Sequence, residues 1–344
     1  MNRQIRQQIA NDMQRGDLKT LQLDDTFKFA CTGCGMCCFD IDVLLNPMDV
    51  YLMMHSKLAR NTHKVRWTYD LHDKGLITSF RGSESKFPLC MIEFRKLPLG
   101  KPKPGEEPEF GVPFCPFLVP AQEGQMEDYL TGVKDRRGVM ALNAKGKRFH
   151  CGLHEEGLKP MICRLSPIGR AWKGDMEKGT LDTPQLFWQP IPNCPGVKKD
   201  RTQSVRAYFE GAGIDKMTKY SDWWYEELWN HWREDLQDMD PISSKRLGLV
   251  LFNLDVVVLG ERIMSKDKPS PESLGRMADA ITEGKVPSLE LDIDGYFELM
   301  KQKVLEFLAY WTANRAELKA AAAKIMAKQQ KEREGAGVPG QSGS

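Results

Sequence analysis

The sequence predicts an α+β fold, with a loop-rich domain organised by a cysteine cluster and followed by a mainly α-helical region. Three observations support this prediction. All nine cysteines of the 344-residue chain lie before position 195. In the same part of the chain glycine and proline recur and long periodic runs are absent, which indicates many chain reversals. After position 200 the helix formers Glu, Leu, Lys, Met and Ala dominate.

These shifts in composition divide the chain into four segments. We expect a polar N-terminal helix within residues 1–24 and the cysteine-rich domain at residues 25–200. A helical region is expected at residues 201–332, followed by a disordered tail at residues 333–344, because its Gly, Ser and Pro cannot build a packed core.

The elements expected in the cysteine-rich domain are short. Asn46 and Pro47 open a helix over residues 47–58, because proline suits the first helical turn. Residues 97–113 contain five prolines and three glycines, which is typical of a loop. Strands are expected in four β-like stretches: 26–30, 39–45, 77–80 and 89–94.

Longer helices are expected after residue 200. Ser221–Gln237 is one, with Ser221 or Asp222 as its N-cap. Apolar residues repeat at intervals of three and four in Asp292–Gln330, which predicts a helix with one apolar face. The run Leu247–Leu259 is predicted to be a buried core element, since it is too short and too polar to span a bilayer.

The aromatic residues at 223–232 admit two interpretations. Four tryptophans in ten residues could form the surface through which the helical region binds a protein partner. We expect instead that they pack against the cysteine-rich domain.

Charge and the N-terminal sequence exclude several classes of protein. The formal net charge is +2, which argues against a protein steered mainly to nucleic acid or to acidic membranes. The first residues lack the apolar core of a secretory signal. We therefore expect a cytoplasmic protein with no membrane association, in which clustered thiols hold metal more often than they form disulfides.

Four cysteines fall within eight residues near the start of the chain. They are Cys31, Cys34, Cys37 and Cys38, in the pattern C-x2-C-x2-C-C. A two-residue spacer lets successive thiolates converge on one centre, and both zinc sites and iron–sulfur proteins use it. Gly33 and Gly35 lie where the backbone must bend sharply and approach the sulfur atoms.

Four later cysteines complete the set of candidate ligands. They are Cys115, Cys151, Cys163 and Cys194. Cys115 and Cys194 each precede a proline, as in iron–sulfur proteins. Arg164 follows Cys163 and is a candidate counter-charge to the cofactor. Cys90 stands alone in an apolar run, and we assign it to the core.

The residues leave the identity of the metal open between zinc and an iron–sulfur cluster, with the latter slightly favoured. If Cys37 and Cys38 lie in an extended stretch, their side chains point to opposite faces, so the pair could supply two separate centres. One larger cluster with spare cysteines is the alternative. His150 and His154 flank Cys151, and of the two His154 is the better candidate for a histidine ligand.

The whole pattern resembles the YkgJ-type cysteine-cluster family, a zinc- or iron-chelating domain. That family shows C-x-x-C-x-x-C-C, then C-P-x-L, then C followed by K/R-P-x-x-C-R-x-x-P, then a final cysteine. The counterparts here are the first four cysteines, Cys115-Pro116-Phe117-Leu118, Cys151, Lys159-Pro160-Met161-Ile162-Cys163-Arg164 with Pro167, and Cys194. The resemblance covers about residues 27–197 and implies metal binding by all eight cysteines.

Two classes of function remain open. The first is a binding protein whose metal centre is structural, transfers electrons or carries metal. The second is an iron–sulfur-dependent enzyme such as a protein-lysine N-methylase, which some relatives of the family suggest. The chain has no H-E-x-x-H or G-x-S-x-G motif, and nothing beyond the candidate ligands looks catalytic, so the first class is favoured.

Overall fold

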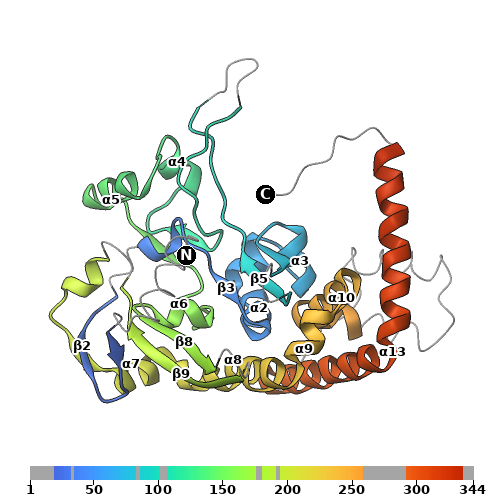
Figure 1. Ribbon diagram of the computed structural model, residues 1–344. Coiled ribbons are helices and arrows are strands. Elements are labelled where there is room, and N and C mark those ends of the chain that lie inside the picture. Colours follow the sequence, from blue (N-terminus) through green and yellow to red (C-terminus); the bar gives the residue numbers. More distant parts are fainter. Residues whose placement is uncertain are drawn as a thin grey trace.

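The structure of the protein is a computed structural model that describes residues 19–31, 35–82, 86–100, 107–175, 180–190, 194–258 and 292–335. Small sheets and short helices lie on one side and longer helices on the other (Figure 1). The predicted α+β class is therefore confirmed. Buried apolar residues from both sides belong to one core cluster.

Within the described residues, the strands pair antiparallel. The sheets are β1 (Thr20–Leu21), β9 (Thr180–Trp188) and β8 (Ile168–Asp175); β10 (Thr202–Ser204) and β2 (Thr26–Lys28); β3 (Leu44–Leu45), β5 (Pro88–Ile92) and β4 (Ile77–Arg81); and β6 (Leu118–Pro120) and β7 (Phe149–Cys151). The pairs β8 with β9 and β4 with β5 are neighbours in the sequence, whereas the other pairs join more distant segments. Strands lie in all four stretches predicted from the sequence, although β2 and β3 are shorter than expected. Pairing of β10 with β2 also joins residues on the two sides of the boundary expected at position 200.

The helices of the first 200 residues are short. They are η1 (Met36–Cys38), α2 (Pro47–Met54), η2 (Leu58–Thr62), α3 (Thr68–Asp73), α4 (Met126–Leu130), α5 (Arg136–Ala144), α6 (Met161–Leu165) and η3 (Pro195–Lys198). The later ones are α7 (Val205–Ala212), α8 (Ile214–Trp223), η4 (Trp224–Trp229), α9 (Asn230–Asp238), α10 (Pro241–Phe252) and α13 (Ile293–Gly335).

Helix α2 begins where the sequence predicts. The Asn46 side chain accepts a hydrogen bond from the backbone N–H of Asp49 (2.9 Å), and the Asp49 carboxylate accepts one from the N–H of Asn46 (3.0 Å). This reciprocal cap satisfies two backbone donors that the helix leaves unpaired. The helix ends at Met54, four residues earlier than expected.

The predicted start of the aromatic helix is wrong. Helical structure begins at Ile214 and continues through α8, η4 and α9, so neither Ser221 nor Asp222 is an N-cap. Asp222 instead accepts two hydrogen bonds from the Arg170 guanidinium, at 2.6 and 2.8 Å, which ties α8 to β8. Both carboxylate oxygens of Asp222 are thus occupied by this strong bidentate pair rather than by backbone N–H groups of a helix start.

Of the aromatic residues, Trp224 packs against the cysteine-rich domain as expected, whereas Trp223 packs against the helical region. The Trp224 ring contacts Phe87 of the cysteine-rich domain, with ring centroids 4.4 Å apart. The Trp223 ring contacts Phe297 of α13. The run from residue 247 is also buried as predicted, with Leu247, Leu251, Phe252 and Leu254 each fully enclosed.

Helix α13 confirms the predicted apolar face. Five residues spaced by three or four are buried: Phe297, Met300, Val304, Leu308 and Trp311. The helix bends at Asn314, whose backbone angles are not helical, and its second part rises away from the body (Figure 1). No helix in the described part of the chain is long and apolar enough to cross a membrane.

Two expectations at the chain ends lie partly outside the described residues. Residues 1–18, where we expected a helix, are not described, and Thr20–Leu21 form strand β1. Residues 336–344 of the expected tail are not described either. Residues 333–335 belong to α13 rather than to a disordered tail.

Asp49 makes the stability of this fold depend on pH. Burial raises the pKa of its carboxyl from 3.8 to about 6. The contribution of Asp49 to folding stability is therefore fully present below pH 3.8 and is lost as the pH rises through about 6. The difference in pKa corresponds to about 3 kcal/mol.

The test compares Asp49→Asn with the wild type. The variant loses one accepted hydrogen bond but cannot ionise, so its free energy of unfolding should fall less between pH 4 and pH 7. The measurement is urea denaturation at a series of pH values across this range. Parallel pH profiles for the two proteins would contradict the prediction.

Candidate metal centre

Backbone hydrogen bonds bring three of the candidate cysteines together. The N–H of Cys115 donates to the carbonyl oxygen of Cys38, at 2.8 Å. Two residues after Pro116, Leu118 pairs with Cys151 across the β6–β7 ladder. Backbone contacts alone therefore bring residues 38, 115 and 151 close together, although they are far apart in the sequence.

A further backbone hydrogen bond brings the segments of Cys31 and Cys194 together. The N–H of Ala30 donates to the carbonyl of Gly196 at 3.0 Å, one residue from Cys31 and two from Cys194. A side chain at Gly196 would lie 2.7 Å from the Ala30 carbonyl oxygen, so only glycine allows this approach.

Cys163 reaches the same place on the short helix α6. The other oxygen of the Asp49 carboxylate accepts the backbone N–H of Met161 at 2.8 Å, which fixes the start of α6 against α2. The buried acid that caps α2 therefore also positions Cys163.

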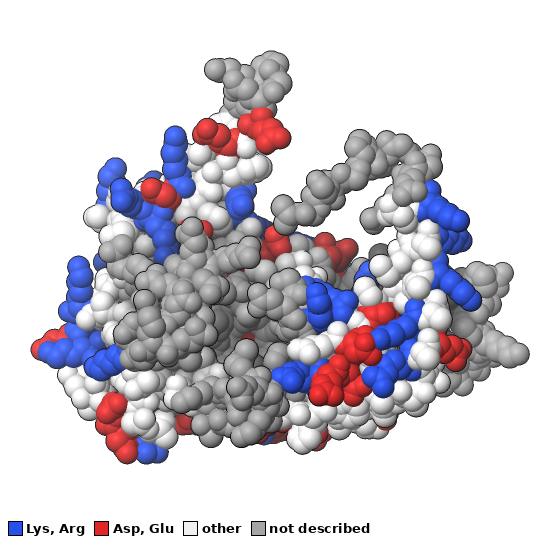
Figure 2. Space-filling view, in the orientation of Figure 1, with Lys and Arg blue, Asp and Glu red and all other residues white. Residues whose placement is uncertain are grey.

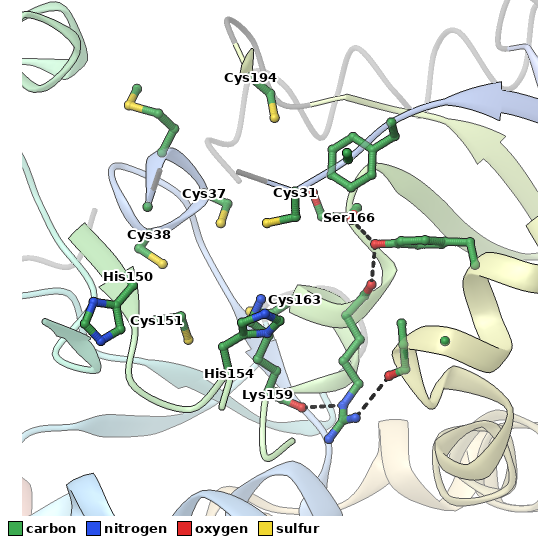
Figure 3. A pocket seen from close by; sticks show the side chains of 18 of the residues that line it. Cys31, Cys37, Cys38, His150, Cys151, His154, Lys159, Cys163, Ser166 and Cys194 are labelled. Carbon is green, nitrogen blue, oxygen red and sulfur yellow. Dashed lines mark hydrogen bonds between the residues drawn. The ribbon is translucent and has the colours of Figure 1, made fainter. Parts of the chain in front are cut away.

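Six of the candidate cysteines line one cavity of about 440 Å³. The cysteines on its wall are Cys31, Cys37, Cys38, Cys151, Cys163 and Cys194. Figure 3 shows sulfur atoms directed toward a common space, with His154 and Lys159 beside them. Among the described residues, no aspartate or glutamate lines this cavity.

A small apolar cavity of about 20 Å³ adjoins the first and brings in Cys115. Cys37, Cys38, Cys151 and Cys163 line both cavities. Seven of the eight predicted ligands therefore surround one region of the structure. The eighth, Cys34, lies outside the described residues.

The condition under which Cys37 and Cys38 would point to opposite faces, an extended stretch, is not met. Residues 36–38 form the 3₁₀ turn η1 rather than an extended stretch, and Cys37 and Cys38 both line the two cavities. Gly35 precedes the turn with φ of 70°, in the left-handed region that favours glycine. Both thiols consequently serve the same region.

The thiols of the site fall into two groups, those whose pKa is lowered and those whose pKa is raised. The hydrogen bond with Cys38 lowers the pKa of Cys37 to about 6 and that of Cys151 to about 7. Contacts with Cys115, Cys151 and Cys37 raise the pKa of Cys38 well above its usual value of 9.0. Burial has the same effect on Cys163. The site thus favours a mixture of thiolates and thiols near neutral pH.

Lys159 and Arg136 supply positive charge near the sulfur atoms, and the sequence interpretation missed both. Lys159 lines both cavities and favours the thiolates of Cys37 and Cys151. Within the described residues its ammonium group has neither a hydrogen bond nor an ion pair. Arg136 donates to the carbonyls of Met36 (2.9 Å) and Phe39 (3.1 Å), across the cysteine turn.

Arg164, predicted as a counter-charge to the cofactor, lines the cavity, but its guanidinium N–H groups donate to backbone carbonyl oxygens. Its guanidinium donates to the carbonyls of Lys159 (2.7 Å), Ala212 (3.2 Å) and Gly157. These bonds link the loop before α6 to the end of α7. Arg164 therefore holds the cysteine-rich domain and the helical region together. Its role toward a cofactor stays a prediction.

Tyr208 of α7 lines the larger cavity together with Cys31 and Cys194. Its hydroxyl donates to the carbonyl oxygens of Arg164 (2.9 Å) and Ser166. Burial, together with the nearby charges of Cys31, Cys37 and Cys194, raises its pKa. It lies in the region after residue 200, where the sequence suggested no site residue.

The remaining candidates lie as follows. His150 and His154 both line the large cavity, and the charge of Lys159 lowers the pKa of His154. Cys90 is fully buried in β5 and lines neither cavity, as expected for a core residue. Burial raises the pKa of its thiol to about 12.

In the described part of the chain, no group of three or more His, Cys, Asp or Glu side chains has the geometry of a preassembled metal site. Comparisons with protein-family models, with curated proteins and with solved structures found no match to this chain.

The turn that carries Cys37 and Cys38 should be sensitive to Gly35→Ala. Any L-residue in this left-handed conformation costs about 1–2 kcal/mol. A Cβ at Gly35 would also lie 3.1 Å from side-chain atoms of Leu118 and Phe149, which adds about 1–3 kcal/mol of overpacking.

Gly75→Ala is the matched control. Gly75 has a similar φ of 60°, but a Cβ there meets nothing within 4 Å. Thermal and urea denaturation should show a larger loss of stability for Gly35→Ala than for Gly75→Ala. Equal losses would mean that close packing does not constrain the cysteine turn.

Proposed function

We propose that the protein is a metal-binding cysteine-cluster protein of the YkgJ type, with an iron–sulfur or zinc centre in a structural, electron-transfer or metal-carrier role. An iron–sulfur cluster is slightly favoured. The proposed ligands are Cys31, Cys34, Cys37, Cys38, Cys115, Cys151, Cys163 and Cys194.

One observation carries this proposal: thiols from five separate stretches of the sequence surround the same pair of cavities. Cysteines that serve only as small apolar residues are expected to be enclosed by neighbouring side chains, as Cys90 is. Seven thiols facing shared empty space are better explained by a ligand that they bind together.

The chemistry of the donors fits a thiolate-bound metal. Soft sulfur ligands select zinc or iron–sulfur clusters, whereas the carboxylates preferred by magnesium and calcium do not occur on the described wall of the cavity. Lys159 and Arg136 would offset the negative charge of several thiolates. When bound, an iron–sulfur cluster would supply electron transfer, whereas zinc would supply a structural cross-link.

A metal bound by thiols of several segments would hold these segments together. Metal affinity would then contribute directly to the stability of this half of the protein. The short elements around the cavity are the part of the fold that would gain most from such a cross-link.

The size of the larger cavity supports a second candidate function, an iron–sulfur-dependent enzyme such as a protein-lysine N-methylase. Small-molecule sites have volumes of about 300–1,000 Å³, and the cavity of about 440 Å³ falls in this range. Ser166, Gln203 and Tyr208 add polar groups to its wall. Turnover of a substrate by the metal-loaded protein would distinguish this function from a binding role.

The experiment is anaerobic purification followed by determination of metal and acid-labile sulfide and a visible absorption spectrum. A brown protein with sulfide would exclude structural zinc, and a colourless protein with zinc would exclude the electron-transfer role. A wild-type protein that binds neither metal would overturn the proposal.

Cys151→Ser and Cys90→Ser form a matched pair for the same measurement. Loss of a ligand should weaken metal binding by at least about tenfold, since even residues behind the ligands have effects of this size. Cys90→Ser should keep the wild-type metal content. Equal losses in the two variants would contradict the ligand assignment.

A further inference from the structure

A basic surface lies beside the cavity and is not explained by metal binding. Residues 134–148 contain six lysines and arginines and one acid, Asp135. We call the five exposed basic side chains of this segment the α5 basic surface: Lys134, Arg137, Lys145, Lys147 and Arg148. Figure 2 shows Lys and Arg side chains gathered over α5.

The charges of the α5 basic surface are not neutralised by the described part of the chain. None of the five forms an ion pair there, and Lys147 instead lies over the Tyr129 ring. The Asp135 carboxylate caps α5 by accepting the N–H of Gly138 at 3.0 Å. Basic residues elsewhere, such as Lys219 and Lys319, are paired with Asp294 and Asp238.

This surface is joined directly to the candidate metal centre. Arg136 of α5 donates to the backbone on both sides of Cys37 and Cys38. Arg148 immediately precedes strand β7, whose last two residues, His150 and Cys151, line the cavity. A partner bound to the α5 basic surface would therefore lie next to the sulfur atoms.

We propose that the α5 basic surface docks an acidic protein that exchanges electrons or metal with the cysteine centre. Complementary charge accelerates and orients the encounter of such partners. A small anion is a poorer occupant, because these exposed side chains are spread from Lys134 before α5 to Arg148 after it and line neither cavity. The net charge of +2 makes nucleic acid a poorer occupant as well. This inference rests on the proposed metal-binding function.

The test uses an acidic [2Fe–2S] ferredoxin as the probe and measures its dissociation constant by anaerobic calorimetry. Three proteins are compared: wild type, K145E/K147E/R148E, and the control K324E/K328E/K331E on the second part of α13. Both triple variants change the net charge equally, and neither alters a proposed ligand. Metal content is determined for all three.

Reversal on the α5 basic surface should weaken binding at least about tenfold, whereas the control should stay within about twofold. Raising the salt from about 50 to 300 mM should weaken wild-type binding by a similar factor. The inference fails if the wild type does not bind, if both variants bind alike, or if a single-stranded DNA oligonucleotide binds more tightly than ferredoxin. A metal-free wild type would instead overturn the proposed function.

Discussion

Backbone pairing beside the cysteines is the constraint on which the candidate centre depends. The bond from Cys115 to Cys38 and the bond from Ala30 to Gly196 each join segments separated by more than seventy residues. The elements around them are only a few residues long. Ordering the loops between them costs conformational entropy, and the short elements contribute few backbone hydrogen bonds to offset this cost. A metal bound by several of the thiols would offset this cost, because the cross-link would form only in the folded chain.

The distribution of charge agrees with a centre made of sulfur. Described carboxylates are absent from the cavity wall, while Lys159 lies beside it and Arg136 holds the cysteine turn. In a partly enclosed site, thiolates without such cations would carry a large electrostatic penalty. Further positive charge lies on the exposed side chains of the α5 basic surface.

Local sequence signals predicted the elements well. Asn46 and Pro47 located the start of α2, and the apolar spacing from Phe297 to Trp311 located the buried face of α13. Both depend on chemistry within a few residues. The convergence of the cysteines was also visible, because their spacing and flanking prolines restrict how the chain can turn.

Signals that depend on distant contacts were missed or misread. Asp222 looks like an N-cap in the sequence, but its partner is Arg170 on another element. Tyr208 reaches the cavity only because α7 packs against α6, which no local pattern indicates. Lys159 could have been identified, since it belongs to the quoted K-P-M-I-C-R motif. No residue near Arg136 in the sequence indicates that its side chain donates hydrogen bonds to the turn that carries Cys37 and Cys38.

X-ray absorption at the metal edge of the purified protein reports the atoms bound to the metal and so tests directly whether the thiols form the centre. Sulfur should dominate the coordination, at about 2.3 Å if the metal is zinc. This sulfur signal should be lost together with the metal when Cys151 or Cys163 is replaced. A metal surrounded by oxygen and nitrogen alone would show that the cysteines are not its ligands.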